Sequence, residues 1–238
     1  MRHLLAWGAA ALALGLPQAQ AAAPAAAGPT AAPAATAATA GAISTPLHQA
    51  AERDDVSAIT QLLAQGAPIN ARDERGRTPL LVATQGNRIR AARALIGAGA
   101  DVNAQDGIQD SPYLYAGASG YLEILTMTLA QGADLRSTNR YGGTALIPAC
   151  ERGHVETVRR LIDAGVALDH VNRLGWTALL EAIVLSDGGP RHQQIVQLLV
   201  DAGADVQWAD SDGVRPLQHA MARGQVEIER ILRAAGAR

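Results

Sequence analysis

The sequence repeats itself with a period of 33 residues, and this period limits the folds that are open to the chain. The first copy begins with Thr45-Pro46-Leu47-His48, and related tetrapeptides begin at residues 78, 111, 144 and 177. A sixth copy begins at residue 215, after a longer step. A Gly-Ala or Gly-Val pair and an Asp or Asn run in step with the tetrapeptide. Because three markers share one period, we predict a stack of small units.

Each copy carries the pattern of two short helices. A Thr or Ser opens five of the copies, where its hydroxyl can cap a helix, and Pro or Ala follows at the first helical position. In the fourth copy, Val155, Val158 and Leu161 then follow at helical spacing, and Gly165 stops the second helix. A polar turn leads into the next copy. One copy cannot bury its apolar side alone, so the copies must stack.

The motifs Thr-Pro-Leu-His-x-Ala at 45–50 and Gly-Ala-Asp-Val-Asn at 99–103, together with the period, resemble ankyrin repeats. The resemblance covers residues 43–238. It implies an all-α ankyrin-repeat solenoid of six helix-turn-helix repeats with hairpin loops, starting near residues 45, 78, 111, 144, 177 and 215. It also implies that the concave face, built from the first helices and the hairpin tips, binds a protein partner.

More narrowly, residues 113–118, 145–154 and 175–183 resemble exported bacterial ankyrin-repeat proteins, some of which are encoded near catalases. We therefore predict a non-catalytic protein–protein interaction module with an unknown protein partner. Two alternatives stay open: an inhibitor or immunity-type protein against an envelope toxin or hydrolase, and an accessory factor in oxidative-stress defence.

Residues 1–21 have the order of a secretory signal peptide: a basic start at Arg2, an apolar run over 4–16, and an Ala-x-Ala site ending at Ala21. The run is too short to cross a bilayer. We expect cleavage near Ala21 and no lipid anchor, because no cysteine stands at the site. Residues 22–42 contain only Ala, Pro, Thr and Gly, and we predict a disordered linker there.

The composition narrows the compartment and the partners. The chain has no phenylalanine and no lysine and is rich in alanine, which suggests a GC-rich bacterial genome. With a signal peptide, that points to the periplasm or to secretion. The 22 acidic residues outnumber the 20 basic ones, the reverse of a nucleic-acid-binding chain. No other long apolar run occurs, so we expect no membrane insertion of the mature chain, and we expect a monomer.

Cys150 is the only cysteine and precedes His154 by four residues. A metal site needs three or four ligands, so this pair does not make one. Cys150 falls at a small helix-packing position of the fourth copy, and we interpret it as a buried, inert thiol. Pro148 lies near the first helical turn, where we expect its missing N–H to cost less than it would deeper in the helix. Sequence motifs of hydrolases, zinc proteases and dinucleotide-binding enzymes are absent, so we predict no catalytic site, metal or cofactor.

Three departures from the repeat pattern carry expectations of their own. Gln109 stands where the hairpin turn should have glycine, and we expect Gly107 to shift that turn. Arg215 replaces the capping Thr in the last copy, which predicts a helix start weaker by about 1 kcal/mol. In the fifth copy, we expect Ser186 to be the turn residue that ends the first helix.

The predicted partner site lies on the concave face of copies three to five. By register, its members are Ile108, Tyr115, Tyr141, Leu174 and Trp176. Exposed aromatic residues are typical interface anchors, and the arginines at 72, 75, 77, 140 and 173 can pair with acidic groups of a partner. The insertion 186–192 adds a second candidate, a protruding contact loop that uses Arg191 and His192. The alternatives are that the first set packs against neighbouring hairpins and that the insertion is only a longer turn.

Overall fold

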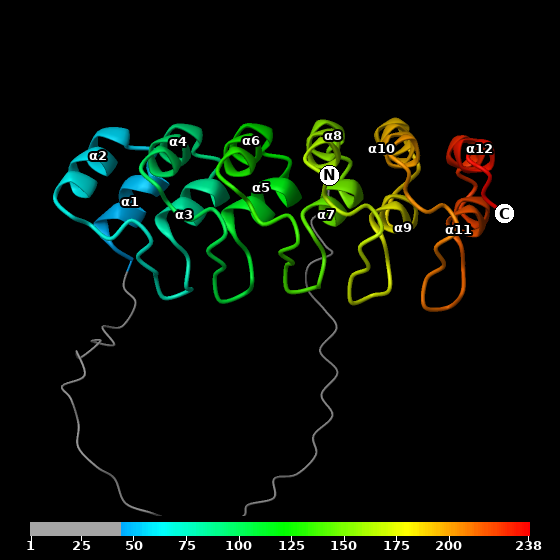
Figure 1. The fold of residues 1–238 in the computed structure, drawn as a ribbon, viewed down its shortest axis with the longest axis horizontal. Helices are drawn as coiled ribbons and strands as arrows, with labels where there is room; N and C mark the ends of the chain where they lie inside the picture. The colour runs from blue at the N-terminus through cyan, green and yellow to red at the C-terminus, as the bar shows by residue number, and fades with distance from the viewer. Residues whose placement is uncertain (1–43) are drawn as a thin grey trace, which may run out of the picture. The chain divides into compact units, whose positions relative to one another are not determined.

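The computed structural model describes residues 44–238, and this part of the chain is all α-helical, without β-strands (Figure 1). The helices form six pairs, one pair for each predicted repeat. The first helices are α1 (Pro46–Glu52), α3 (Pro79–Gln85), α5 (Pro112–Ser119), α7 (Leu146–Glu151), α9 (Ala178–Val184) and α11 (Pro216–Ala222). The second helices are α2 (Val56–Ala64), α4 (Ile89–Gly97), α6 (Leu122–Ala130), α8 (Val155–Asp163), α10 (Pro190–Asp201) and α12 (Val226–Ala234). The predicted signal peptide 1–21 and linker 22–42 lie outside the described residues.

The helices of residues 44–238 lie in two layers. Each first helix packs against the first helix of the next repeat, and each second helix against the next second helix. Figure 1 shows the two rows, with the loops between repeats projecting from the row of first helices. The predicted all-α ankyrin-repeat architecture is therefore confirmed. No helix among these residues is both long and apolar enough to traverse a lipid bilayer.

Alanines allow the first helices to pack closely. One alanine in each repeat occupies the same register position and is almost fully buried: Ala50, Ala83, Ala116, Ala149, Ala182 and Ala220. In α5 the next position is Gly117, where an added Cβ would lie 2.8 Å from the Cβ of Ala145. Protein interiors are packed too densely to absorb such a contact without movement. These small residues therefore set the spacing between repeats three and four.

Side-chain caps define where the first helices begin. The hydroxyls of Thr78, Ser111 and Thr177 each accept the backbone N–H three residues ahead, as predicted. Arg215 makes no such bond in the last repeat. There the Gln218 side chain accepts the N–H of Arg215 instead, at 2.8 Å. The start of α11, which has Arg215 in place of a capping threonine, is thus capped by the side chain of Gln218.

Residues with positive φ separate the two helices of each pair. They are Asp54, Asn87, Gly120, Gly153, Gly188 and Gly224. The prediction of Ser186 was wrong: the insertion moves this role to Gly188, whose φ is 69°. The turn is packed, because Gln225 of the last repeat donates from its amide nitrogen to the carbonyls of Ile183 and Ser186. The inserted residues thus lengthen α10 to 12 residues and join repeats five and six.

Side chains of the following repeat bond to carbonyls at the ends of α1, α5 and α9. Arg88 donates to the carbonyl of Glu52, and Arg152 donates to that of Ala118. Arg223 bonds in the same way near the end of α9. The last carbonyls of a helix have no partner within the helix. These arginines therefore stabilise the stacking as well as the helix ends.

Candidate functional site

Five hairpin loops, here called fingers, connect the six repeats. Their residues are 69–77, 102–110, 135–143, 168–176 and 206–214 for fingers 1 to 5. The base of each finger holds the Asp or Asn of the repeat pattern, whose side-chain oxygen accepts two backbone N–H groups two and four residues ahead. In finger 3, for example, Asn139 accepts the N–H groups of Tyr141 at 2.9 Å and Gly143 at 3.1 Å. The same turn therefore places the residue at every finger tip.

The turn of finger 2 differs from the expectation that Gly107 would shift it, because Gln109 takes the usual glycine position. Gln109 has φ 65° and occupies the position that Gly76, Gly142, Gly175 and Gly213 fill in the other fingers. The turn is not shifted to Gly107. A left-handed conformation is unfavourable for a residue with a Cβ, but the Asp106 carboxylate holds the N–H groups on both sides of Gln109. The finger geometry thus overrides the preference of a single residue.

Neighbouring fingers touch along their length. The N–H of Gly107 donates to the carbonyl of Arg75 at 2.9 Å, and that of Arg173 to the carbonyl of Tyr141 at the same distance. Fingers 2 and 3 are joined by the amide of Gln105, which donates to the carbonyl of Thr138 at 2.8 Å. The tips therefore form one continuous row, and a ligand can contact several of them at once.

Three consecutive tips in this row are apolar and exposed. The exposed fractions are 51% for Ile108, 39% for Tyr141 and 56% for Leu174. The guanidinium of Arg140 lies over the Tyr141 ring, 4.9 Å from its centroid. The first and last tips are the exposed residues Arg75 and Asp212. We call Arg75, Ile108, Tyr141, Leu174 and Asp212 the tip row.

Tyr115 and Trp176 are half-buried and lie away from the tips. Tyr115 is on α5, and its ring centroid is 6.3 Å from that of Tyr121 at the start of α6. Trp176 directly precedes the cap of α9, and its N–H is bound by Asn172 at 3.1 Å. For these two residues, packing within the molecule accounts for part of the surface. The structure therefore gathers three of the five predicted residues at the tips and leaves these two nearer the helices.

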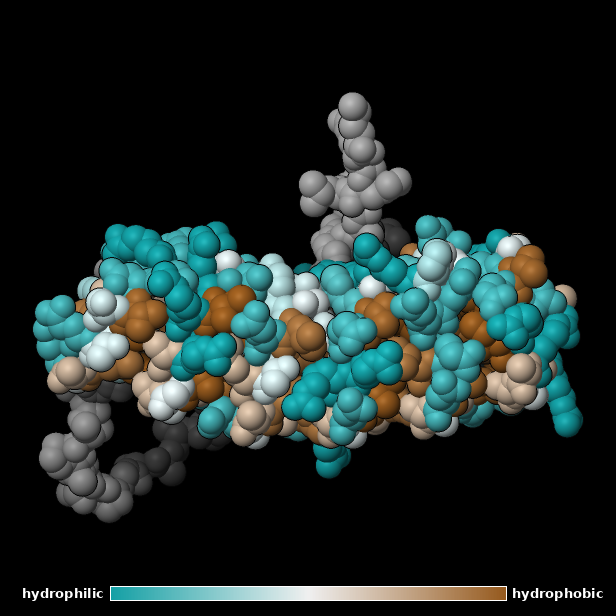
Figure 2. Space-filling view, turned by 90° about the horizontal axis from the view of Figure 1, so that it is seen from above, coloured by the Kyte–Doolittle hydropathy of each residue, from teal (hydrophilic) through white to brown (hydrophobic). Residues whose placement is uncertain are grey.

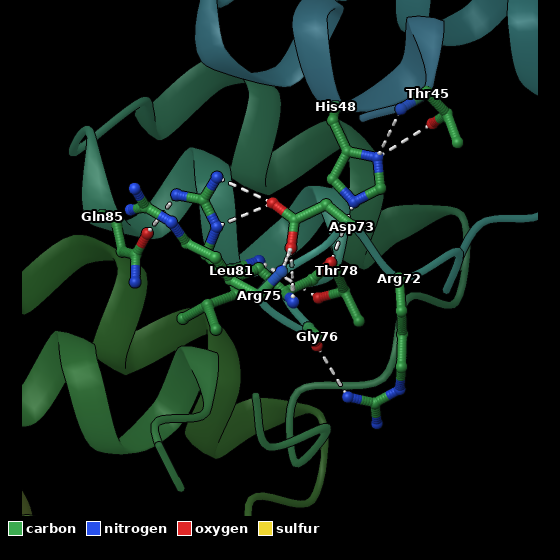
Figure 3. A network of polar contacts seen from close by, with 10 residues as sticks. Thr45, His48, Arg72, Asp73, Arg75, Gly76, Thr78, Leu81 and Gln85 are labelled. Atoms are coloured by element: carbon green, nitrogen blue, oxygen red, sulfur yellow. Dashed lines mark hydrogen bonds and ion pairs between the residues drawn. The ribbon is translucent and has the colours of Figure 1, made fainter. Parts of the chain in front are cut away.

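Most arginines predicted to meet a partner are occupied within the chain. Arg77 pairs with Asp73 at 2.7 Å and with Gln85 at 2.9 Å. Figure 3 shows the first finger, where Arg72 donates to the carbonyl of Gly76. Arg72 also donates to the carbonyl of Gln105 in finger 2. Such bonds stabilise the fingers and lower the availability of these groups to a ligand. Arg75 is the arginine of finger 1 whose side chain has no ion pair or hydrogen bond with residues 44–238.

The insertion does not form the predicted contact loop. Arg191 and His192 lie in the first turn of α10, which begins at Pro190. The ring of His192 is hydrogen-bonded through Nε2 to the carbonyl of Glu151 at 3.0 Å. The loop prediction was wrong for these two residues, because the added chain extends a helix. Arg191 remains exposed, whereas His192 links repeats four and five.

Three carboxylates, Asp110 in finger 2, Glu151 in α7 and Glu181 in α9, have raised pKa values. Glu181 is only 5% exposed, and burial together with the nearby Glu151 raises its pKa to about 7, although the Asn172 amide donates to it at 2.6 Å. Burial also raises the pKa of Glu151 and that of Asp110. A carboxyl group with a pKa near 7 changes its charge at neutral pH. Among residues 44–238, no group of three or more His, Cys, Asp and Glu side chains is placed to hold a metal ion.

The Cys150 thiol is fully buried in α7, as predicted. Burial and the neighbouring Glu181 raise its pKa well above the ordinary value. A protonated thiol without solvent contact is a poor nucleophile. The structure therefore argues against oxidant sensing by this residue.

Some exposed apolar residues were not predicted from the sequence. Among them, Leu185 is the C-cap of α9 and is 48% exposed, and Trp208 lies in finger 5 and is 42% exposed. Both stand at positions where other repeats carry small or polar residues.

On the side opposite the fingers, Figure 2 looks down on the second helices, where hydrophilic residues separate the hydrophobic ones. The row of apolar tips is thus a feature of the finger side.

Comparison with known proteins agrees with the repeat pattern. The family model described as ankyrin repeats (3 copies) matches residues 33–106 and 113–207. The crystal structure of an ankyrin repeat domain from Acinetobacter baumannii AYE is 66% identical, covers 81% of this chain and 98% of its own, and has a TM-score of 0.80. The ankyrin repeat domain of Bcl-3, a member of the IkappaB protein family, is 28% identical, covers 82% and 87%, and has a TM-score of 0.73.

A relative in Escherichia coli (strain K12), YahD, is named for its ankyrin repeats. It is 53% identical over 57 residues, which are 24% of this chain and 28% of that protein. Ankyrin repeats indicate a protein–protein interaction module, and proteins of this kind are generally non-enzymatic scaffolds. Because the family model matches most of the chain, the protein belongs to the ankyrin repeat family.

Proposed function

We propose that the chain is a non-catalytic protein-binding module of the bacterial periplasm, and that its partner lies across fingers 2 to 4. The exposure of Ile108, Tyr141 and Leu174 on three consecutive tips carries this proposal. Apolar and aromatic side chains within a polar rim are typical anchors of protein interfaces. Their turns are held by hydrogen bonds before a partner arrives, so binding needs little reorganisation.

The support for the location is the signal-peptide pattern of residues 1–21. The proposal predicts a mature chain that begins close to residue 22 and is recovered in the periplasmic fraction. Mass spectrometry of the protein purified from fractionated cells measures both. A full-length chain in the cytoplasmic fraction would contradict the proposed location and would leave the binding surface to be tested separately.

Crosslinked capture from a periplasmic extract tests the binding surface. We expect Tyr141→Ala/Trp176→Ala to lose a protein that the wild type captures, because the tyrosine of finger 3 and the tryptophan of finger 4 are removed. The matched control is Glu156→Ala/Arg159→Ala, which removes an exposed ion pair from α8 on the other side. Circular dichroism checks that all three proteins are equally helical. Equal capture by both double variants would rule out this surface.

A further inference from the structure

The residues of the tip row are ordered so that the row is complementary to a second copy of itself in the reverse direction. From finger 1 to finger 5 the tips are Arg75, Ile108, Tyr141, Leu174 and Asp212. A positive charge stands at one end, a negative charge at the other, and two aliphatic residues flank a central tyrosine. A second copy turned by 180° about Tyr141 presents a negative charge to Arg75 and an apolar residue to each apolar residue.

The two charged ends are available for such pairing. Both Arg75 and Asp212 are exposed, and neither side chain forms an ion pair or hydrogen bond with residues 44–238. Their backbone N–H groups are bound by Asp73 at 2.9 Å and Asp210 at 3.0 Å, which fixes where the side chains start. The charges are therefore held at the ends of the row without being neutralised there.

We propose that two copies of the chain associate through the tip row, antiparallel, around a two-fold axis at Tyr141. Arg75 then faces the partner's Asp212, Ile108 faces the partner's Leu174, and Tyr141 faces the partner's Tyr141. A two-fold interface must be self-complementary in this sense, with residue i meeting j and j meeting i. The positive charge of Arg140 near the axis is offset by Asp110 of the same copy, at 3.9 Å.

The size of the surface sets the strength of this association. Five tips contribute from each copy, far fewer than the roughly 20–30 residues a side of a standard stable interface. The dimer is therefore weak and depends on protein concentration, and it replaces the monomer expected from the sequence. This inference goes beyond the proposed function, since it requires no other protein. A partner bound to the same tips competes with the second copy.

Site-directed disulfide crosslinking tests the axis, because a disulfide requires Cα atoms within about 7 Å of each other. Oxidation of purified Tyr141→Cys should give a covalent dimer, since this residue meets itself. Ile108→Cys and Leu174→Cys should each stay monomeric, whereas the double variant Ile108→Cys/Leu174→Cys should crosslink. Cys150 is fully buried and provides a built-in background control. No dimer from Tyr141→Cys, or equal yields from all three single variants, would overturn the proposal.

A charge exchange tests the ends of the row. In the Tyr141→Cys background, Arg75→Asp places two negative charges at each end and should lower the crosslinking rate about tenfold. Adding Asp212→Arg restores opposite charges and should restore the rate, as should high salt in part for the single exchange. An unchanged rate in the single exchange, or no recovery in the double exchange, would contradict the antiparallel pairing. Capture of a periplasmic protein is measured separately, so either idea can fail alone.

Discussion

The first helices of repeats four and five occupy the same register but begin differently. In repeat five, the Thr177 hydroxyl accepts the N–H of Leu180, and the N–H of Glu181 donates to the Thr177 carbonyl at 3.0 Å. Repeat four has Pro148 at the position of Glu181. Proline has no N–H to donate, α7 begins only at Leu146, and the buried Thr144 hydroxyl has no hydrogen-bond partner. The other five repeats make this backbone bond, so repeat four is the one that lacks it among residues 44–238.

Both repeats therefore place an unfavourable residue at one position of the repeat, for different physical reasons. Pro148 removes a backbone hydrogen bond, whereas Glu181 buries a carboxylate whose only side-chain partner in residues 44–238 is Asn172. The helices that carry them, α7 and α9, each pack against the first helices of both neighbouring repeats. Stacking between repeats, more than local preference, therefore decides the shape of a repeat in this molecule.

The largest change in stability is expected from the alanine substitution of Asn172 in finger 4, compared with that of Asn139 in finger 3. Asn172→Ala removes two bonds to the finger backbone and the bond to Glu181, while Asn139→Ala removes only the equivalent two backbone bonds. We expect losses in the free energy of unfolding of about 4 kcal/mol and about 2 kcal/mol. Urea denaturation measures both. Equal losses would mean that the Asn172–Glu181 bond adds nothing to the stability of repeat five.

The second effect depends on pH. Because the pKa of Glu181 is about 7 in the folded protein and near 4.5 when exposed, the folded state holds the proton more tightly than the unfolded state does. The cost of the charged form is absent below pH 4.5, grows as the pH rises to 7, and stays constant above it. Glu181→Gln should therefore stabilise the protein by about 3 kcal/mol at pH 8 and leave it unchanged at pH 4. A gain that is independent of pH would refute this origin.

A third prediction concerns a substitution that gives repeat four the residue that repeat two has at the position of Pro148. Val82 occupies the position of Pro148 in α3, and its N–H donates to the Thr78 carbonyl at 3.0 Å. Pro148→Val should restore this bond in α7 and raise the free energy of unfolding by about 1.5 kcal/mol. Thermal unfolding followed by circular dichroism provides the measurement. A loss of stability would show that the proline ring contributes more through packing than it costs.

The smallest change in stability is expected from alanine substitutions of the threonines that precede α9 and α7. Thr177→Ala removes a hydroxyl that caps α9 and should cost about 1 kcal/mol, whereas Thr144→Ala removes a hydroxyl without a partner and should cost close to nothing. In the Pro148→Val background, Thr144→Ala should again become costly, because the helix start is restored. Equal costs for the two threonines in the wild type would mean that α7 is capped in solution.

The sequence predicted the architecture well because the repeat is a physical unit. The capping Thr or Ser and the Asp or Asn of each finger recur at fixed spacing, and each side chain acts within four residues of its own position. Such local bonds can be read from spacing alone. The shift from Ser186 to Gly188 could not be predicted in this way, because it depends on contacts between the insertion and Gln225, 37 residues further along the chain.

The candidate site was predictable only in part. The exposed tips Ile108, Tyr141 and Leu174 follow from their place in the turn. The availability of the arginines does not, because Arg72 bonds to the next finger and Arg77 to its own finger and to α3. The sequence predicts a contact role for His192, and the structure shows its ring hydrogen-bonded to a carbonyl of the previous repeat. Hydrogen bonds between side chains and neighbouring repeats are the hardest feature to predict from a single sequence.

Photocrosslinking in the cells that make the protein tests most directly whether the finger side binds a partner. A photoreactive residue replaces Tyr141 in one strain and Arg159, on the second-helix side, in another. We predict an adduct with a different protein at position 141 and none at position 159, with any self-adduct identified by its mass. Adducts at position 159 alone would contradict binding on the finger side. So would the absence of any adduct with another protein at position 141 while the chain is present in the periplasm.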